Sequence, residues 1–114
     1  MDSGSSGKFN FYTEGTCVPG VFISIGTYVV YPRQLIEISG FVGWGDYDGE
    51  FQILVDNTIV GGGRSSPSDR TASINYLGST ILADSNSVLD VKVKHFAPSN
   101  RIFKCNILGL KTNL

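Results

Sequence analysis

The sequence is poor in the side chains that enzymes and charge-driven binding proteins depend on. It has one histidine, two cysteines and one tryptophan, and only 17% of its residues are charged, against roughly 25% in an average globular domain. Nine Lys and Arg face ten Asp and Glu, which gives a formal net charge of −1. This balance excludes a nucleic-acid-binding protein that acts through a basic surface. The hydrophobic content of 41% argues against a disordered chain.

Long apolar runs are also missing. No segment approaches the roughly 18 apolar residues of a membrane-spanning helix, so we expect no membrane insertion. Residues 1–7 (MDSGSSG) lack the basic and apolar regions of a signal peptide, and we interpret them as a flexible Ser/Gly leader. Residues 8–114 then suffice for a single domain. Its near-neutral charge favours association over solubility.

The few cysteines and the one histidine do not form a metal site. Cys17 and Cys105 lie near opposite ends of the chain, and His95 alone cannot complete a four-ligand set. Alternation puts Cys105 on the apolar side of its segment, which predicts a buried thiol that packs as a small hydrophobe. A disulfide between the two cysteines remains the alternative, and the redox compartment therefore stays open.

Most of the sequence has the residue pattern that is typical of β-strands. Almost every segment after residue 8 alternates apolar and polar residues and ends at Gly, Pro, Asn, Asp or Ser. The predicted strands are Lys8–Tyr12, Val21–Val30, Gln34–Trp44, a hairpin over Glu50–Val60, Thr71–Leu77, Thr80–Ala83, Val88–Phe96 and Arg101–Leu110. Residues 77–89 are also compatible with a short helical turn. About eight short strands predict an all-β fold, an antiparallel β-sandwich of jelly-roll topology.

Local signals refine this prediction. Asp56 and Asn57 tolerate a positive φ and suit a tight hairpin turn. We expect a bulge at Gly26, and we expect the glycines 61–63 to end the hairpin. In Gln34–Trp44, alternation predicts one face with Ile36, Ile38, Val42 and Trp44, opposite Glu37 and Ser39.

Catalytic motifs are absent. His95 shares a strand face with Leu89, Val91 and Val93, so we interpret it as a buried structural residue rather than a general base. No Gly-x-Ser-x-Gly or Ser-x-x-Lys motif supplies a nucleophile. We therefore expect no enzymatic activity and no cofactor.

Two segments are candidate ligand-binding loops. The first is Trp44-Gly45-Asp46-Tyr47-Asp48-Gly49-Glu50, which places two aromatic rings among three acids, as sugar-binding sites often do. It also resembles part of a calcium loop, although the full ligand spacing is missing, and a solvated hairpin whose tryptophan anchors the core is the simplest alternative. The candidate ligand-binding residues here are Trp44, Asp46, Tyr47 and Asp48.

The second candidate loop is Arg64–Arg70, where Arg64, Arg70 and three serines could hold an anion. No phosphate-cradling motif follows it, so a mobile loop at the tip of the sandwich is the alternative. Loop tips are nevertheless where such folds keep binding functions.

The distribution of charge along the chain and the apolar residues on both faces of some strands are typical of a protein that self-associates. Residues 37–56 hold five acids and no base, and residues 92–111 hold five bases and no acid. If these stretches lie on different sides, the acidic side of one subunit could meet the basic side of the next. Bulky residues also occur on both faces of several strands, for example Phe41 beside Val42 and Ile102 beside Phe103. A second subunit is the natural cover for such outer faces.

Three segments carry a strand layout that resembles a known family: Leu35–Trp44, Phe51–Asn57 and the closing Ile107–Leu110. The layout is similar to that of small jelly-roll heads of tumour-necrosis-factor-like topology. Such heads cap trimeric phage and viral spikes, fibres and capsid decorations. The resemblance covers residues 8–114 and carries over no functional residue. It implies a non-catalytic homotrimer on a virion surface or in the extracellular space. Its partners would be copies of itself, other virion proteins, or a host glycan or receptor. The alternative function is a lectin-like carbohydrate-binding module.

Overall fold

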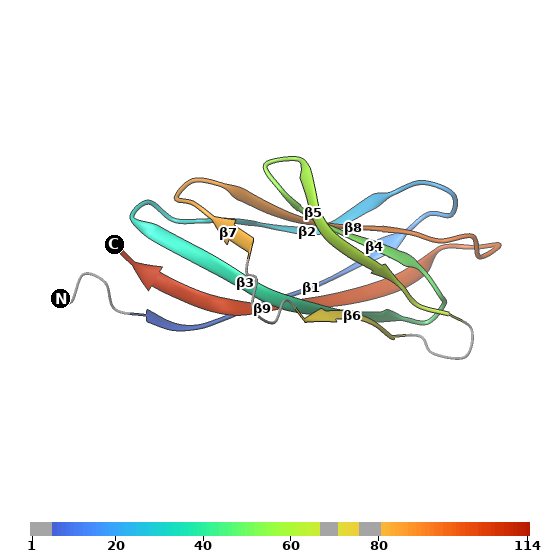
Figure 1. Ribbon diagram of the computed structural model, residues 1–114. Helices are drawn as coiled ribbons and strands as arrows, with labels where there is room; N and C mark the ends of the chain where they lie inside the picture. The colour runs from blue at the N-terminus through green and yellow to red at the C-terminus, as the bar shows by residue number, and fades with distance from the viewer. Residues whose placement is uncertain (1–5, 67–70, 76–80) are drawn as a thin grey trace.

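The protein consists of two antiparallel β-sheets that pack face to face (Figure 1). The computed structural model describes residues 6–66, 71–75 and 81–114, and within these ranges it contains strands and turns but no helix. The predicted all-β class is therefore confirmed. The strands are β1 Ser6–Cys17, β2 Ile23–Val29, β3 Gln34–Gly45, β4 Glu50–Val55, β5 Thr58–Arg64, β6 Thr71–Asn75, β7 Ile81–Ala83, β8 Val88–Lys94 and β9 Arg101–Asn113.

One sheet has five strands and the other has four. In the five-stranded sheet the order is β1-β9-β3-β6, and β7 also pairs with β3. In the four-stranded sheet the order is β2-β8-β4-β5. Because β6 and β7 pair with successive parts of β3, they together fill one strand position, which agrees with the prediction of about eight strands.

The core lies between the sheets and is rich in aromatic residues. Phe51 stands at its centre, with its ring centroid 5.8 Å from Phe103 in an edge-to-face arrangement and 6.5 Å from Phe41. Towards the other end, Phe9 meets Tyr28 at 5.1 Å. Such ring pairs add about 0.5–1.5 kcal/mol each beyond the area they bury. The sheets are joined along one side, where the Thr13 hydroxyl donates to the Ile25 carbonyl at 2.5 Å.

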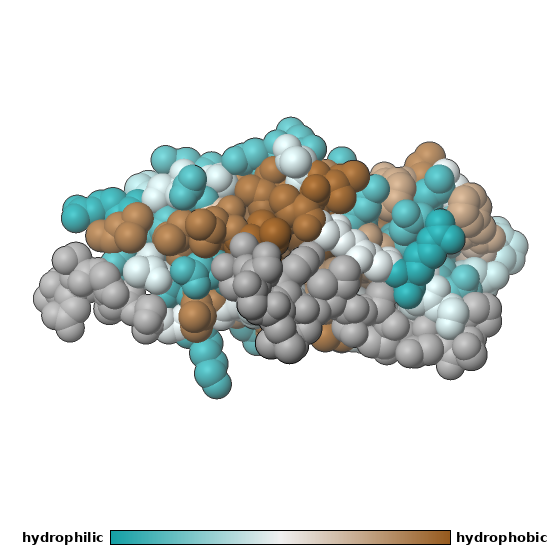
Figure 2. All heavy atoms as spheres, viewed as in Figure 1, coloured by the Kyte–Doolittle hydropathy of each residue, from teal (hydrophilic) through white to brown (hydrophobic). Residues whose placement is uncertain are grey.

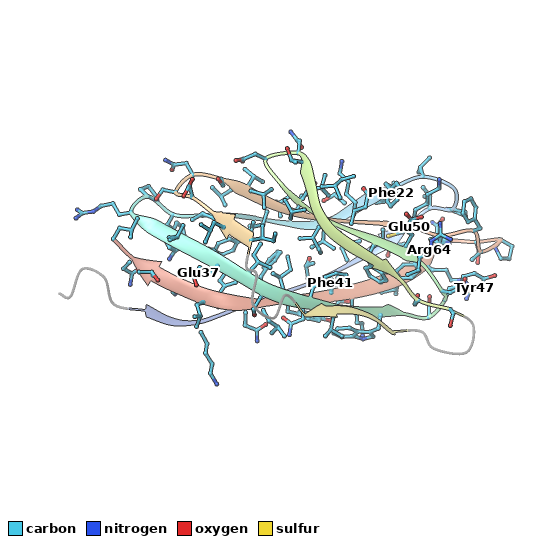
Figure 3. All side chains as sticks on the ribbon, in the orientation of Figure 1. Phe22, Glu37, Phe41, Tyr47, Glu50 and Arg64 are labelled. Carbon is cyan, nitrogen blue, oxygen red and sulfur yellow. The ribbon has the colours of Figure 1, made fainter. Side chains whose placement is uncertain are left out.

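A β-bulge in β3 reverses part of the predicted side-chain pattern. The register against β9 shifts between Ile38 and Gly40, so one extra residue is accommodated there. Ile36 and Ile38 point inward as expected, but Phe41 is buried at 1% exposure, while Val42 and Trp44 turn to the outer face. The prediction that Val42 and Trp44 share a face with Ile36 and Ile38 was therefore wrong, because a single bulged residue shifts the period-two alternation to the other face. Phe41 is labelled in Figure 3.

The predicted hairpin is confirmed, with one change. Asp56 and Asn57 have φ values of 50° and 66°, as a two-residue primed turn between β4 and β5 requires. The three glycines 61–63 do not end the hairpin. They pair with residues 51–53 of β4, and β5 continues to Arg64.

The bulge predicted at Gly26 is also present, since the register of β2 against β8 shifts between Ser24 and Gly26. A side chain at Gly26 would collide with Thr13 of β1. This glycine therefore allows the edges of the two sheets to approach each other.

Two further expectations need correction. The strand β1 begins at Ser6, inside the segment interpreted as a leader. The acidic and basic stretches do not lie on different sides of the protein, because the strands that carry them are neighbours: β3 pairs with β9 and β4 pairs with β8. Glu50, for example, lies directly opposite Lys94.

Candidate functional site

Two hollows on the surface contain residues that the sequence singled out. The larger, of about 370 Å³, lies on the outer face of the five-stranded sheet near one end. It is lined by Glu14, Trp44, Gly45, Asp46, Ile102 and Lys104. The side chains of Glu14, Lys104 and Trp44 form one row across β1, β9 and β3, because these residues are paired in register.

Tyr12 contacts two residues of this row, Glu14 and Trp44. The Tyr12 hydroxyl donates a hydrogen bond of 2.9 Å to Oε1 of Glu14. The Tyr12 ring lies 6.2 Å from that of Trp44. This hydrogen bond raises the pKa of Tyr12, because loss of the phenolic proton would break it beside a carboxylate.

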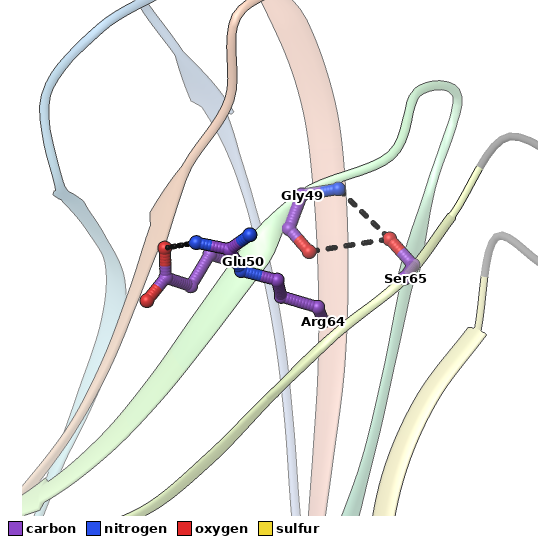
Figure 4. A network of polar contacts seen from close by, with 4 residues as sticks. All are labelled: Gly49, Glu50, Arg64 and Ser65. Carbon is purple, nitrogen blue, oxygen red and sulfur yellow. Dashed lines mark hydrogen bonds and ion pairs between the residues drawn. The ribbon is translucent and has the colours of Figure 1, made fainter.

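The smaller hollow, of about 120 Å³, lies where β4, β5 and β8 meet. Its lining residues are Asp48, Gly49, Glu50, Arg64, Ser65, Lys94, His95 and Phe96. The Ser65 hydroxyl accepts a hydrogen bond of 2.8 Å from the Gly49 amide and donates one of 3.3 Å to the Gly49 carbonyl (Figure 4). The Ser65 amide also donates to the Gly49 carbonyl, at 2.9 Å. In the same hollow, a guanidinium nitrogen of Arg64 lies 3.1 Å from a carboxylate oxygen of Glu50.

The structure divides the first predicted loop between these two hollows. Trp44 and Asp46 line the larger one, and Asp48 lines the smaller one. Tyr47 belongs to neither, because it packs against the core, 6.3 Å from the His95 ring, with the Arg101 guanidinium 5.3 Å from its own ring. The structure therefore does not bring Trp44, Asp46, Tyr47 and Asp48 together in one hollow, and their role in ligand binding stays a prediction.

The second predicted loop is only partly described. Arg64 ends β5 and reaches the smaller hollow, whereas Arg70 lies outside the described residues.

His95 and the cysteines have structural roles, as predicted. His95 is 1% exposed: its Nε2 donates to the Cys17 carbonyl at 2.7 Å, and its Nδ1 accepts from the Ala97 amide at 3.1 Å. Both ring nitrogens are therefore engaged, with the proton on Nε2. Cys17 and Cys105 are buried and free, so no disulfide joins them. Burial raises the pKa of the Cys17 thiol to about 11 and that of Cys105 to about 12.

Lys94 and Phe96 of the smaller hollow were not predicted from the sequence. Glu50 was placed among the three acids of the first candidate loop, but not among the candidate ligand-binding residues. The signal for Phe96 was present. Since Val91, Val93 and His95 point inward, the same alternation directs Phe96 outward, and this side chain is 74% exposed. The pairing of Glu50 with Lys94 and Arg64 depends on strand order, which one sequence does not reveal.

No protein-family model matches the chain, and no curated protein matches it. Within the described residues, no cluster of three or more His, Cys, Asp or Glu side chains could hold a metal ion. In the same part of the chain, no helix has the length and apolar character that a membrane crossing demands.

Proposed function

We propose that the protein is a non-catalytic homotrimeric module of a virus or phage particle, a head for attachment or a decoration of the capsid, and that its subunits meet through the outer face of the five-stranded sheet. The observation that carries this proposal is the difference between the two outer faces. The five-stranded sheet exposes large apolar side chains from three strands: Tyr12, Leu82, Ile102, Leu108 and Leu110.

The register spreads these apolar residues over neighbouring rows that also contain polar side chains. Leu110 lies opposite Glu37, which lies opposite Leu82, and Leu108 follows in the next row. Val42 and Trp44, turned outward by the bulge, extend the same face. An exposed sheet face of this composition is typical of an interface between subunits.

The four-stranded sheet presents a polar outer face instead. Ser24 donates a hydrogen bond of 2.6 Å to Asp90, and Lys92 and Gln52 follow in paired register. Its exposed apolar residues are fewer: Val29 and Val88 form a pair at one end, and Ile59 lies opposite Leu54 on the edge strand β5. A solvated face of an antiparallel sheet has this composition. The contrast therefore favours burial of one face only.

The strand order supports the jelly-roll topology within this proposal. The chain crosses between the two sheets at most connections, and its first and last strands pair along their whole length, from Ser6–Thr112 to Cys17–Arg101. The threefold symmetry and the location on a virion surface are the parts of the proposal that rest on the resemblance to tumour-necrosis-factor-like heads. A closed ring of three copies buries the same patch on every subunit.

The environments of the histidine and the two thiols support a non-catalytic role. Both nitrogens of His95 are engaged within the fold, and the two thiols are buried with raised pKa values. A thiol with such a pKa is a poor nucleophile near neutral pH.

The experiment is light scattering on a matched pair of variants. Wild-type protein should have three times the chain mass of 12.3 kDa. Leu108→Glu puts a charge on the proposed interface and should give monomers, whereas Val29→Glu, on the other sheet, should leave the trimer intact. A trimer unaffected by Leu108→Glu, with the fold of each variant checked by circular dichroism, would place the interface elsewhere.

A carbohydrate-binding module is the second candidate function, favoured by the larger hollow. There the Trp44 ring lies beside the carboxylates of Glu14 and Asp46 and the ammonium group of Lys104. A face buried between subunits leaves no room for a sugar, so the two functions exclude each other at this position. A glycan array on which the wild type binds and Trp44→Ala does not, together with a monomeric mass, would favour the module.

A further inference from the structure

We propose that the smaller hollow, between Phe96 and the Glu50–Arg64 ion pair, binds a neutral sugar residue. The hollow is formed entirely by residues of or beside the four-stranded sheet. It is therefore separate from the proposed subunit interface, and the inference does not depend on the proposed trimer.

Phe96 supplies the apolar surface. Its neighbours His95 and Ala97 are 1% and 3% exposed, and Phe96 between them is directed outward with 74% of its surface in solvent. The backbone on either side is fixed, because the Ala97 amide donates to the His95 ring and the Gly20 amide donates to the His95 carbonyl at 2.8 Å. The ring is thus presented on a rigid support rather than on a mobile loop.

A second ring stands close by. The Lys94 ammonium nitrogen lies 5.2 Å from the Phe96 ring centroid and 5.6 Å from that of Phe22. Both distances are within the range of a cation–π interaction, so one cationic group contacts both rings. In Figure 3, Phe22 lies at the same end of the molecule as Glu50 and Arg64, and Figure 2 shows hydrophilic and hydrophobic side chains next to each other there.

The polar groups have the composition that a hydroxyl-rich ligand requires. Asp48 and Glu50 are hydrogen-bond acceptors, and Arg64 and Lys94 are donors. Two negative and two positive groups balance, which disfavours a strongly charged ligand such as a phosphate. A sugar hydroxyl both donates and accepts, and the C–H face of a pyranose ring packs on an aromatic ring. Binding sites generally combine apolar contact area with a few fixed polar groups in this way.

Strand pairing brings the polar groups next to one another. Glu50 pairs in register with Arg64 on one side and Lys94 on the other, so all three side chains come from one row of the sheet. The buried Ser65 hydroxyl ties the end of β5 to Gly49. A hollow of about 120 Å³ suits one terminal sugar residue rather than a long chain.

The test is saturation-transfer NMR with four probes: methyl α-mannoside, methyl β-galactoside, methyl β-glucoside and N-acetylglucosamine. We expect at least one to bind the wild type and to bind Phe96→Ala at least tenfold more weakly. Glu50→Gln should also weaken binding. Tyr31→Ala removes another exposed aromatic ring, from the turn after β2, and should leave binding unchanged.

Three results would overturn the inference. In the first, the wild type binds none of the four probes at millimolar concentration. In the second, Phe96→Ala binds with unchanged affinity. In the third, Trp44→Ala no longer binds the probe while Phe96→Ala still does. The third would assign sugar binding to the larger hollow instead. The mass of each variant, measured in parallel, distinguishes these results from failure of the proposed trimer.

Discussion

His95 contacts three parts of one end of the molecule, two through its ring nitrogens and one through its ring. It binds the Cys17 carbonyl at the end of β1 and the Ala97 amide, and its ring lies 5.3 Å from Phe103. Replacement by alanine leaves a buried carbonyl and amide without partners and opens a cavity. We expect His95→Ala to lower the free energy of unfolding by about 2–4 kcal/mol in urea denaturation. A loss below about 0.5 kcal/mol would contradict the structural role.

Because of the two buried thiols, we expect the free energy of unfolding to decrease as pH rises in the alkaline range. In the unfolded chain both ionise near the usual pKa of 9.0, but in the folded protein the values are raised to about 11 and 12. Unfolding therefore releases thiol protons above pH 9, and this contribution to stability is lost as pH rises through the folded-state values. Each thiol should contribute a slope of about 1.4 kcal/mol per pH unit within its window.

The measurement is denaturation at pH 8 to 10.5 for the wild type and for Cys17→Ala/Cys105→Ala. The double variant should lose less stability over this range than the wild type does. Equal losses would mean that the thiols ionise alike in the folded and unfolded states. Neither native thiol should react with a disulfide reagent at pH 8.

Among the elements, the β4–β5 turn depends most directly on residue type. Asn57 has a φ of 66°, a conformation that glycine adopts without strain and alanine does not. We expect Asn57→Ala to destabilise the protein by about 1 kcal/mol and Asn57→Gly to be neutral or stabilising. Thermal melting of the two variants is the check, and equal melting temperatures would contradict the assigned turn. Asp56 is unsuitable as a control, because its carboxylate accepts bonds from Ser87 and the Val88 amide.

The strands and turns could be predicted because they depend on local signals. Alternation in Val88–Lys94, the Asp56-Asn57 turn and the bulge at Gly26 are all visible in the sequence. The bulge after Ile38 was not, because it depends on the partner strand β9, where Gly109 leaves no side chain to collide with the Glu37 carbonyl. Missing it put Trp44 on the wrong face. The candidate site was harder still, since Asp48, Arg64 and Lys94 meet only through pairing of β4 with β5 and β8.

For the whole molecule, we expect assembly to change the environment of Trp44. It is the one tryptophan in the sequence, and the bulge directs it to the outer face of the five-stranded sheet. Its fluorescence should shift to longer wavelength when the protein is diluted below the dissociation constant of the trimer. The emission of a Leu108→Glu monomer should already be shifted at high concentration. Emission that is identical in both proteins at every concentration would show that Trp44 lies outside the interface.

The most direct test of the central claim is sedimentation equilibrium of the wild-type protein over a wide concentration range. If the apolar outer face of the five-stranded sheet is a subunit interface around a threefold axis, the data fit a monomer–trimer equilibrium with a limiting mass of three times 12.3 kDa. A single species of 12.3 kDa at every concentration would contradict the account, because that face would then remain in solvent.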